Sequence, residues 1–303
     1  MCIRDRQCIF NLCLAILEMG DEVVIPAPYW VSYADIVQLT GAKPIIVTCD
    51  ISQQFKITPS QLEESITDAT KLVFLNSPSN PTGAVYSKDE LRSLADILLK
   101  HPHVYIGTDD IYEHINLGDN PFYNILMVEP KLKDRVIVLN GVSKAYSMTG
   151  WRIGFAAGPK EIISAMSKLQ SQSTSNPTSI SQVAAEAALR GSRDCIIPMV
   201  KAFKERHEYV LEALNDINGV KCIPAEGAFY AFCDANEAID QLYESRKIDQ
   251  KNDLAFADYL LESQGVAVVP GSAFGLDGYF RISFATSMDN LVEAIKRIKK
   301  AIE

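Results

Sequence analysis

The chain has 303 residues, of which 48% are hydrophobic and 22% are charged, and its formal net charge is −9. This composition is typical of a globular enzyme that is large enough to fold as two domains. The negative charge and the lack of a basic block disfavour nucleic-acid binding, and no stretch has the roughly 20 apolar residues that a membrane span needs.

The first twenty residues allow two interpretations. Arg4 and Arg6 precede the apolar run 9–17, as in a signal peptide, but an acidic segment follows in place of a small-residue cleavage site. The other interpretation is the end of a helix over residues 7–19 that stops at Gly20, before a buried strand, and the family resemblance given below favours it. The seven cysteines are scattered and form no Cys-x-x-Cys pair, which indicates reduced thiols and a cytoplasmic location.

Apolar runs and helix patterns then alternate along the first half of the chain. The predicted buried strands are 23–25, 44–47, 73–75, 104–107, 136–139 and 153–156. Two helices begin with capping boxes, one at Thr58 and one at Ser87, and the second runs to about Lys100. The alternation predicts an α/β domain with a mostly parallel central sheet, helices on both faces, and ligands beyond the carboxyl ends of the strands.

The remaining elements predict a smaller α+β unit. A helix over 179–189 precedes a longer helix over 194–214. Beyond them we expect strands at 220–223, 229–232, 266–268 and 279–284, and helices at 254–263 and 289–302. We therefore predict a large domain at residues 1–193 and a small C-terminal domain at residues 194–303, joined by the long helix.

The most specific chemistry lies in the run Asn140-Gly-Val-Ser-Lys-Ala-Tyr-Ser-Met-Thr-Gly-Trp-Arg152, directly after a predicted strand. Lys144 can form a Schiff base with an aldehyde if its amine is partly desolvated. Arg152 offers the planar fork that a phosphate accepts, and the Ser143 hydroxyl offers another donor. An aldehyde that carries a phosphate describes pyridoxal 5'-phosphate (PLP), although a lone lysine near a turn is more often a surface residue.

The segment from Ser143 to Phe155 resembles the cofactor-lysine segment of class I PLP-dependent aminotransferases of fold type I, in particular the bacterial aspartate aminotransferases. Three further segments agree with that family in the expected order, namely Pro28-Tyr-Trp-Val-Ser-Tyr33, Asn76-Ser-Pro-Ser-Asn-Pro-Thr-Gly83 and Asp109-Asp-Ile-Tyr112. The resemblance extends from about Phe10 to the C-terminus. It implies the aspartate aminotransferase fold and a PLP-dependent transferase.

The resemblance also implies roles for residues at the predicted strand ends. Lys144 binds the cofactor aldehyde, and Asp109, rather than Asp110, pairs with the ring nitrogen and keeps it protonated, so that the ring can accept electrons. Tyr112 and Asn80 donate to the phenolic oxygen of the ring, whose negative charge they stabilise. Judged alone, Asp109 could instead cap a loop, and Tyr112 could be a buried hydroxyl that the backbone satisfies.

The phosphate is expected to be bound by Ser143, Arg152 and a helix N-terminus. Trp30 is expected to lie over the face of the cofactor ring beside the substrate, although core packing would be the better interpretation without its motif. Tyr33, three residues later on the same side of a helix, is expected to line the pocket without a chemical role. No residue pattern indicates a metal site.

Arg281 lies in an otherwise apolar strand, where an arginine without a partner is costly. By resemblance it binds the α-carboxylate of the substrate, together with Asn80; an internal ion pair is the competing interpretation. We further predict a cis peptide bond between Asn80 and Pro81, within a rigid turn.

The implied reaction is a ping-pong transamination, with Lys144 as the general base and with aspartate and 2-oxoglutarate as the expected substrates. Three alternatives stay open. The chain could be an aromatic, alanine or kynurenine aminotransferase, a PLP-dependent lyase of the same fold, or a PLP-binding protein that does not turn over.

A homodimer is implied as well for the full-length form, with Asn176 of one subunit near the active site of the other. Family members begin well before the first residue of this chain, and the additional region holds a glycine-rich turn under the phosphate and a tyrosine that reaches the neighbouring subunit. We therefore expect an N-terminally truncated chain with impaired cofactor binding and dimerisation. Residues 1–6 match nothing in the family, which suggests that they are not native.

Overall fold

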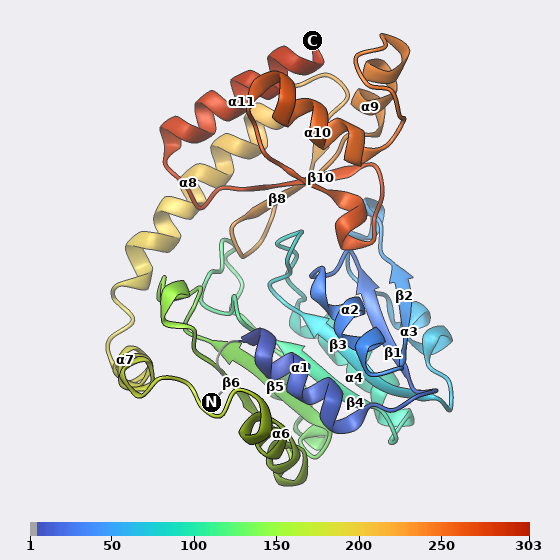
Figure 1. The fold of residues 1–303 in the computed structure, drawn as a ribbon, viewed down its shortest axis with the longest axis vertical. Coiled ribbons are helices and arrows are strands. Elements are labelled where there is room, and N and C mark those ends of the chain that lie inside the picture. Colours follow the sequence, from blue (N-terminus) through green and yellow to red (C-terminus); the bar gives the residue numbers. More distant parts are fainter. Residues whose placement is uncertain (1–4) are drawn as a thin grey trace.

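The computed structural model describes residues 5–303, and they form a six-stranded sheet and a four-stranded sheet. In Figure 1 the smaller sheet and its helices, in yellow, orange and red, lie above the larger sheet. Among the described residues, every helix is too short or too polar to cross a lipid bilayer. The interpretation of residues 1–6 as non-native falls largely on residues outside the described part of the chain.

The large sheet has the strand order β2-β1-β3-β4-β5-β6. Its strands are β1 (Glu22–Ala27), β2 (Lys43–Thr48), β3 (Thr70–Asn76), β4 (Tyr105–Asp109), β5 (Val136–Gly141) and β6 (Gly154–Ala157). The first five strands pair in parallel, and β6 pairs antiparallel with β5. The predicted mostly parallel α/β fold is thus confirmed.

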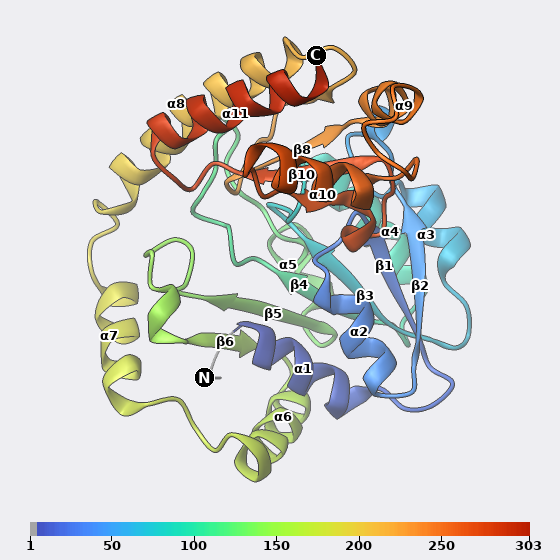
Figure 2. The same ribbon diagram turned by 45° about the horizontal axis from the view of Figure 1, so that its top comes forward.

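Both faces of this sheet are covered by helices. Successive side chains of a strand point to opposite faces, so each strand contributes to two separate cores. Val23, Ile25 and Phe74 belong to the core on one face, and Val24 and Val73 belong to the core on the other. The first face packs against α1 (Asp5–Ile16), α2 (Ser32–Leu39) and α6 (Lys160–Ser173). The second packs against α3 (Pro59–Ser65), α4 (Lys88–Lys100) and α5 (Ile125–Val128). Figure 2 shows α1 lying across its face of the sheet.

Local signals account for several helix boundaries. The two predicted capping boxes are present, at Thr58 for α3 and at Ser87 for α4. Helix α1 ends at Ile16 rather than at Met19 as predicted. The reason is that the backbone N–H of Glu18 donates to the carboxylate of Asp21 (2.9 Å) instead of to a helical carbonyl.

The small sheet has the order β7-β8-β10-β9, and its strands pair antiparallel. Its strands are β7 (Lys221–Cys222), β8 (Tyr230–Asp234), β9 (Val269–Pro270) and β10 (Tyr279–Ser283). Its helices are α8 (Ile196–Asn215), α9 (Asn236–Glu244), α10 (Asp253–Gln264) and α11 (Met288–Ile302). Helix α7 (Ser179–Arg190) precedes α8 and lies at the periphery in both views (Figures 1 and 2).

Within the small unit, one predicted strand is misplaced and one helix was not predicted. The strand expected at 266–268 lies instead at residues 269–270. Gly265 ends α10 in the left-handed conformation, and the N–H of Val266 bonds back to the carbonyl of Leu260, so the chain reaches the sheet a few residues later. Helix α9 has no counterpart among the predicted elements.

The small unit is held to the large one by backbone hydrogen bonds at a close approach. The carbonyl of Gly83 accepts from the N–H groups of Glu226 (3.0 Å) and Gly227 (2.9 Å). Gly83 has φ +69°, and a Cβ atom there would lie 2.6 Å from the Cβ of Ala225. The loop before β8 is thereby fixed against the loop after β3, at the carboxyl edge of the large sheet. The domain boundary at residues 193 and 194 remains a prediction.

Candidate active site

Strand order and register bring most of the predicted site residues to one edge of the large sheet. Asn76 at the end of β3 pairs with Asp109 at the end of β4, which pairs in turn with Leu139 of β5. Gly141 of β5 pairs with Gly154 of β6. Ser143 follows the first glycine by two residues and Arg152 precedes the second by two, so both lie at the same edge, with Lys144 between them in the chain.

Asp109 is buried, with 4% of its surface exposed, and its carboxylate is held in place. The Tyr33 hydroxyl donates to its Oδ2 at 2.6 Å, and the side chain of Asn76 donates to its backbone carbonyl at 2.8 Å. Burial raises the pKa of Asp109 to about 7, whereas the bond from Tyr33 and the charge of Lys144 act in the opposite direction. A cation placed against this carboxylate would therefore be stabilised strongly.

Asp110 has a separate set of partners. Its carboxylate accepts from the hydroxyl of Thr108 and from the amide of Asn124, both at 2.6 Å. The two adjacent acids thus have different hydrogen-bond partners. Only Asp109 is in contact with Tyr33.

Lys144 is half-buried among aromatic rings. Its Nζ lies 5.6 Å from the ring centroid of Tyr112 and 5.5 Å from that of Phe229. Both distances fall within the range of cation–π attraction. The amine is therefore close to Tyr112 and exerts its charge on Asp109, as expected for one common site.

Tyr112 and Asn80 are both expected to donate to the phenolic oxygen of the cofactor. In this structure each has a partner of its own. The hydroxyl of Tyr112 lies 2.8 Å from that of Tyr230, and either can be the donor. The Oδ1 atom of Asn80 accepts from Nη1 of Arg281 at 2.7 Å. The predicted cis bond between Asn80 and Pro81 is confirmed.

Arg281 extends from β10 toward the large sheet and is enclosed by aromatic rings. Its guanidinium carbon lies 4.4 Å from the ring centroid of Tyr230 and 4.8 Å from that of Phe274. Burial lowers the pKa of Arg281. Its Nε is buried and has no hydrogen-bond partner among the described residues. A carboxylate is the group that such a fork of donors binds best.

Ser143 and Arg152 provide donors for a second anion. The Oγ of Ser143 is buried and has no partner among the described residues, with 3% of the residue exposed. Arg152 has φ +57°, and its Nη1 donates to the carbonyl of Thr149 at 2.7 Å. These donors fit a phosphate, and together with Asp109 and Lys144 they fit PLP.

Trp30 lies beside this edge but precedes α2, so it does not share a helix with Tyr33, and the predicted helical spacing was wrong. The two rings nevertheless meet edge to face, with centroids 5.3 Å apart. Sequence reasoning gave Tyr33 no role beyond lining the pocket, and it did not single out Phe229, Tyr230 or Phe274. Phe229 and Tyr230 lie in an apolar run, and Phe274 lies in a turn between Gly271 and Gly275, where no sequence signal was recognised.

A family model described as aminotransferase class I and II matches residues 6–298. The chain belongs to the aminotransferase class I and II family. It is therefore an aminotransferase, and members of its family depend on PLP.

Individual relatives agree with this family assignment. The chain is 56% identical over 293 residues to the aspartate/prephenate aminotransferase of Nitrosomonas europaea, which covers 97% of this chain and 74% of that protein. The crystal structure of the aspartate aminotransferase from Rhizobium meliloti matches with a TM-score of 0.94 and 47% identity, over 99% of this chain and 75% of that one. The aromatic aminotransferase from Pyrococcus horikoshii matches with a TM-score of 0.91 and 35% identity, over 99% and 78%.

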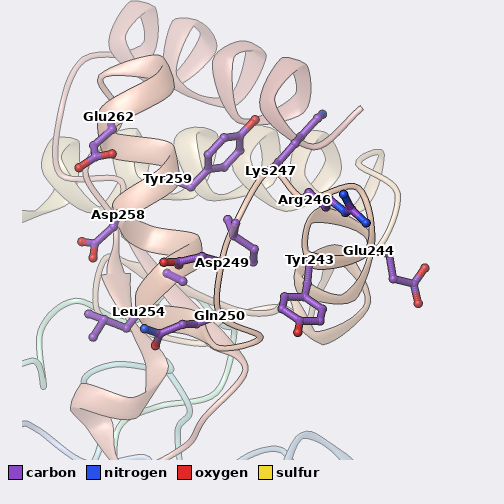
Figure 3. Close-up of a pocket in the computed structure, with 12 residues that line it drawn as sticks. Tyr243, Glu244, Arg246, Lys247, Asp249, Gln250, Leu254, Asp258, Tyr259 and Glu262 are labelled. Carbon is purple, nitrogen blue, oxygen red and sulfur yellow. The ribbon is translucent and has the colours of Figure 1, made fainter.

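An open pocket of about 950 Å³ lies elsewhere, on the small unit between the end of α9 and α10. Figure 3 shows its lining, in which Tyr243, Arg246 and Lys247 stand opposite Asp258 and Glu262. None of the predicted site residues lines it. It is a surface depression between two helices that has no connection to the aminotransferase site.

Proposed function

We propose that this aminotransferase binds PLP at the carboxyl edge of its large sheet. When bound, PLP supplies an aldehyde that condenses with amines and a ring that accepts electrons. Ser143 and Arg152 would hold the phosphate, Asp109 the ring nitrogen, and Tyr112 and Asn80 the phenolic oxygen. Trp30 would lie over the ring. The buried hydroxyl of Ser143, which no group of residues 5–303 hydrogen-bonds, supports the phosphate assignment.

The observation that carries this proposal is the convergence of an amine, an acid and a phenol from neighbouring strand ends. Lys144 Nζ lies 5.6 Å from the ring of Tyr112, and its charge opposes the rise in the pKa of Asp109 that burial causes. We propose that Lys144 would hold the aldehyde of PLP and that its amine would serve as the general base for the proton on the substrate Cα. Asp109 keeps its negative charge against the ring nitrogen throughout.

We propose an L-amino acid, in particular aspartate, as the amino donor and 2-oxoglutarate as the acceptor. Arg281 and Asn80 would bind the α-carboxylate, because two aromatic rings contact the guanidinium and its buried Nε has no hydrogen-bond partner within residues 5–303. The name of the Nitrosomonas relative adds prephenate as a second candidate acceptor.

The test is the visible absorption of the purified protein with PLP. Addition of L-aspartate should abolish the band of the lysine-bound cofactor, and 2-oxoglutarate should restore it. A band that does not respond to any amino acid indicates binding without turnover, and the absence of a band contradicts the proposal. Comparison of aspartate with phenylalanine, alanine and kynurenine then identifies the donor.

We further propose a homodimer in the cytoplasm. Helix α7 supports the dimer, because Ile180 and Val183 leave 70% and 67% of their surface exposed on one side of this peripheral helix. The free cysteines among the described residues support the cytoplasmic location. Asn176, which is exposed in the segment before α7, remains the candidate for a contact with the neighbouring active site.

A further inference from the structure

Tyr230 of β8 contacts two residues of the candidate active site at once. Its hydroxyl lies 2.8 Å from the hydroxyl of Tyr112, and its ring centroid lies 4.4 Å from the guanidinium carbon of Arg281. Only 6% of Tyr230 is exposed. Because Tyr112 follows β4 of the large sheet and Arg281 lies on β10 of the small sheet, Tyr230 connects the two halves of the site.

The position of Tyr230 is fixed from two directions. In the small sheet Tyr230 pairs with Ser283, and its neighbour two residues on, Phe232, pairs with Arg281. Tyr230 and Arg281 are therefore diagonal neighbours on one face of the sheet. Three residues before Tyr230, the N–H of Gly227 donates to the carbonyl of Gly83 at 2.9 Å, which fixes the start of β8 against the large unit.

We propose that Tyr230 is a positioning residue for both halves of the reaction site. Its hydroxyl donates to the oxygen of Tyr112, so that the proton of Tyr112 is directed to the phenolic oxygen of the cofactor. Its ring contacts the guanidinium of Arg281 and so fixes its position, with the remaining donors directed at the substrate carboxylate. This inference rests on the proposed function, since both roles refer to PLP and to an amino acid substrate.

The direction of the hydrogen bond follows from the charges around it. Burial raises the pKa of Tyr230, while the bond with Tyr112 and the positive charge of Arg281 oppose that rise. Burial, followed by the interaction with Tyr230, raises the pKa of Tyr112, so Tyr230 is the more acidic hydroxyl of the pair. The hydroxyl beside the cation is the better donor, and hydrogen bonds in a chain polarise one another. Tyr112 should therefore donate more strongly to the cofactor than it would without Tyr230.

This arrangement has a spectroscopic consequence. A donor to the phenolic oxygen stabilises negative charge there and so lowers the proton affinity of the nitrogen that joins Lys144 to the cofactor. Loss of the Tyr230 hydroxyl should weaken that donor, and the pH midpoint of the visible band should rise. Tyr112→Phe, which removes the donor itself, should shift the midpoint in the same direction and further.

The experiment compares wild-type protein loaded with PLP with Tyr230→Phe, Tyr230→Leu, Tyr112→Phe and, as the matched control, Tyr279→Phe. Tyr279 is another buried tyrosine of the small sheet, and it stacks on Phe232 with centroids 5.1 Å apart. Tyr230→Phe should raise the midpoint by about 0.5 pH unit or more and change KM for the amino acid by less than about threefold, because the ring stays over Arg281.

Tyr230→Leu, which loses the ring as well, should also raise KM by about tenfold or more, and Tyr279→Phe should leave both quantities unchanged. The inference is overturned if Tyr230→Phe titrates like the wild type, or if Tyr279→Phe moves the midpoint equally. If the wild type itself develops no band with PLP, the proposed function fails and the inference fails with it. The wild-type spectrum therefore separates the two failures.

Discussion

Asp109 and Asp110 are adjacent, buried acids. Replacing each of them should affect stability similarly but activity differently. Burial raises the pKa of each to about 7, well above the value of about 3.9 in an unfolded chain. A raised folded pKa means that ionisation opposes folding, so stability falls as the pH rises from about 4 to about 7. Only Asp109 faces Tyr33 and the charge of Lys144, and only Asp109 is assigned to the cofactor.

Asp109→Asn should therefore stabilise the cofactor-free protein while abolishing its activity. At pH 8 we expect the free energy of unfolding to rise by about 2–4 kcal/mol, because the amide retains an acceptor for Tyr33 but carries no buried charge. The gain should vanish toward pH 4, and turnover should fall by at least about 100-fold at every pH. Denaturant unfolding at several pH values and a transaminase assay measure the two effects.

Asp110→Asn is the matched control. The Thr108 hydroxyl can reverse its role and accept from the new amide, so a comparable pH-dependent gain in stability is expected with turnover within about fivefold of wild type. Equal loss of turnover in both variants would contradict the assignment of Asp109 to the ring nitrogen.

The residues with a motif around them could be found from the sequence, whereas their structural partners could not. Lys144, Asp109, Tyr112, Arg152 and Arg281 stand in segments whose order and spacing are specific. Tyr230 lies 118 residues from Tyr112, in an apolar strand pattern that predicts burial but no partner. Such a pairing depends on how the two sheets are placed, which no local pattern encodes.

At the scale of elements, the end of α4 depends on a single distant side chain. The guanidinium of Arg135 donates to the carbonyls of Leu98, His101 and Val104 at 2.9, 2.9 and 2.7 Å. These carbonyls lie in the last turn of the helix and in the loop that follows, where those of Leu98 and His101 also accept long backbone bonds of 3.2 Å from His101 and Val104. Arg135 therefore joins α4 to the start of β5.

Arg135→Ala should lower the free energy of unfolding by about 2–3 kcal/mol, because three acceptors lose a charged donor. Arg190→Ala provides the comparison, since Arg190 makes an exposed pair with Glu186 one turn earlier on α7. That variant should unfold at the wild-type denaturant concentration. Equal midpoints for the two variants would show that Arg135 does not stabilise this junction.

Capping signals and buried strands were the elements that the sequence predicted well. A capping box is a local contact among four residues, as at Thr58 and Ser87, and fully apolar strands of a covered sheet are distinct in composition. The two-residue strand β9 and helix α9 were not predicted at their positions. Their bounds depend on where the chain meets the rest of the small unit, as Gly265 illustrates.

At the scale of the whole molecule, the alternation of strands and helices predicted the fold class. It did not predict how closely the two sheets approach each other. The active site depends on that approach, because Arg281 of the small sheet bonds to Asn80 in the loop after β3 of the large sheet. The contact is set by backbone bonds around Gly83 and Gly227, which leave no sequence pattern beyond the glycines themselves.

Dimer formation is also a property of the whole molecule. Ile180→Glu combined with Val183→Glu should prevent dimer formation, because both side chains would carry charge into an apolar interface. Sedimentation should show the wild type as a dimer and the variant as a monomer with unchanged helix content. Leu39→Glu, at an exposed leucine on α2, should remain dimeric. A wild-type protein that is monomeric at every concentration would contradict the proposed dimer.

Lys144 is the residue on which the whole account depends. The protein should be incubated with PLP, reduced with borohydride, digested, and analysed by mass spectrometry for the modified peptide. We predict one phosphopyridoxyl group on Lys144, and none on the Lys144→Ala variant treated in the same way. Full labelling at another lysine, or undiminished labelling of the variant, would contradict the assignment of the active site.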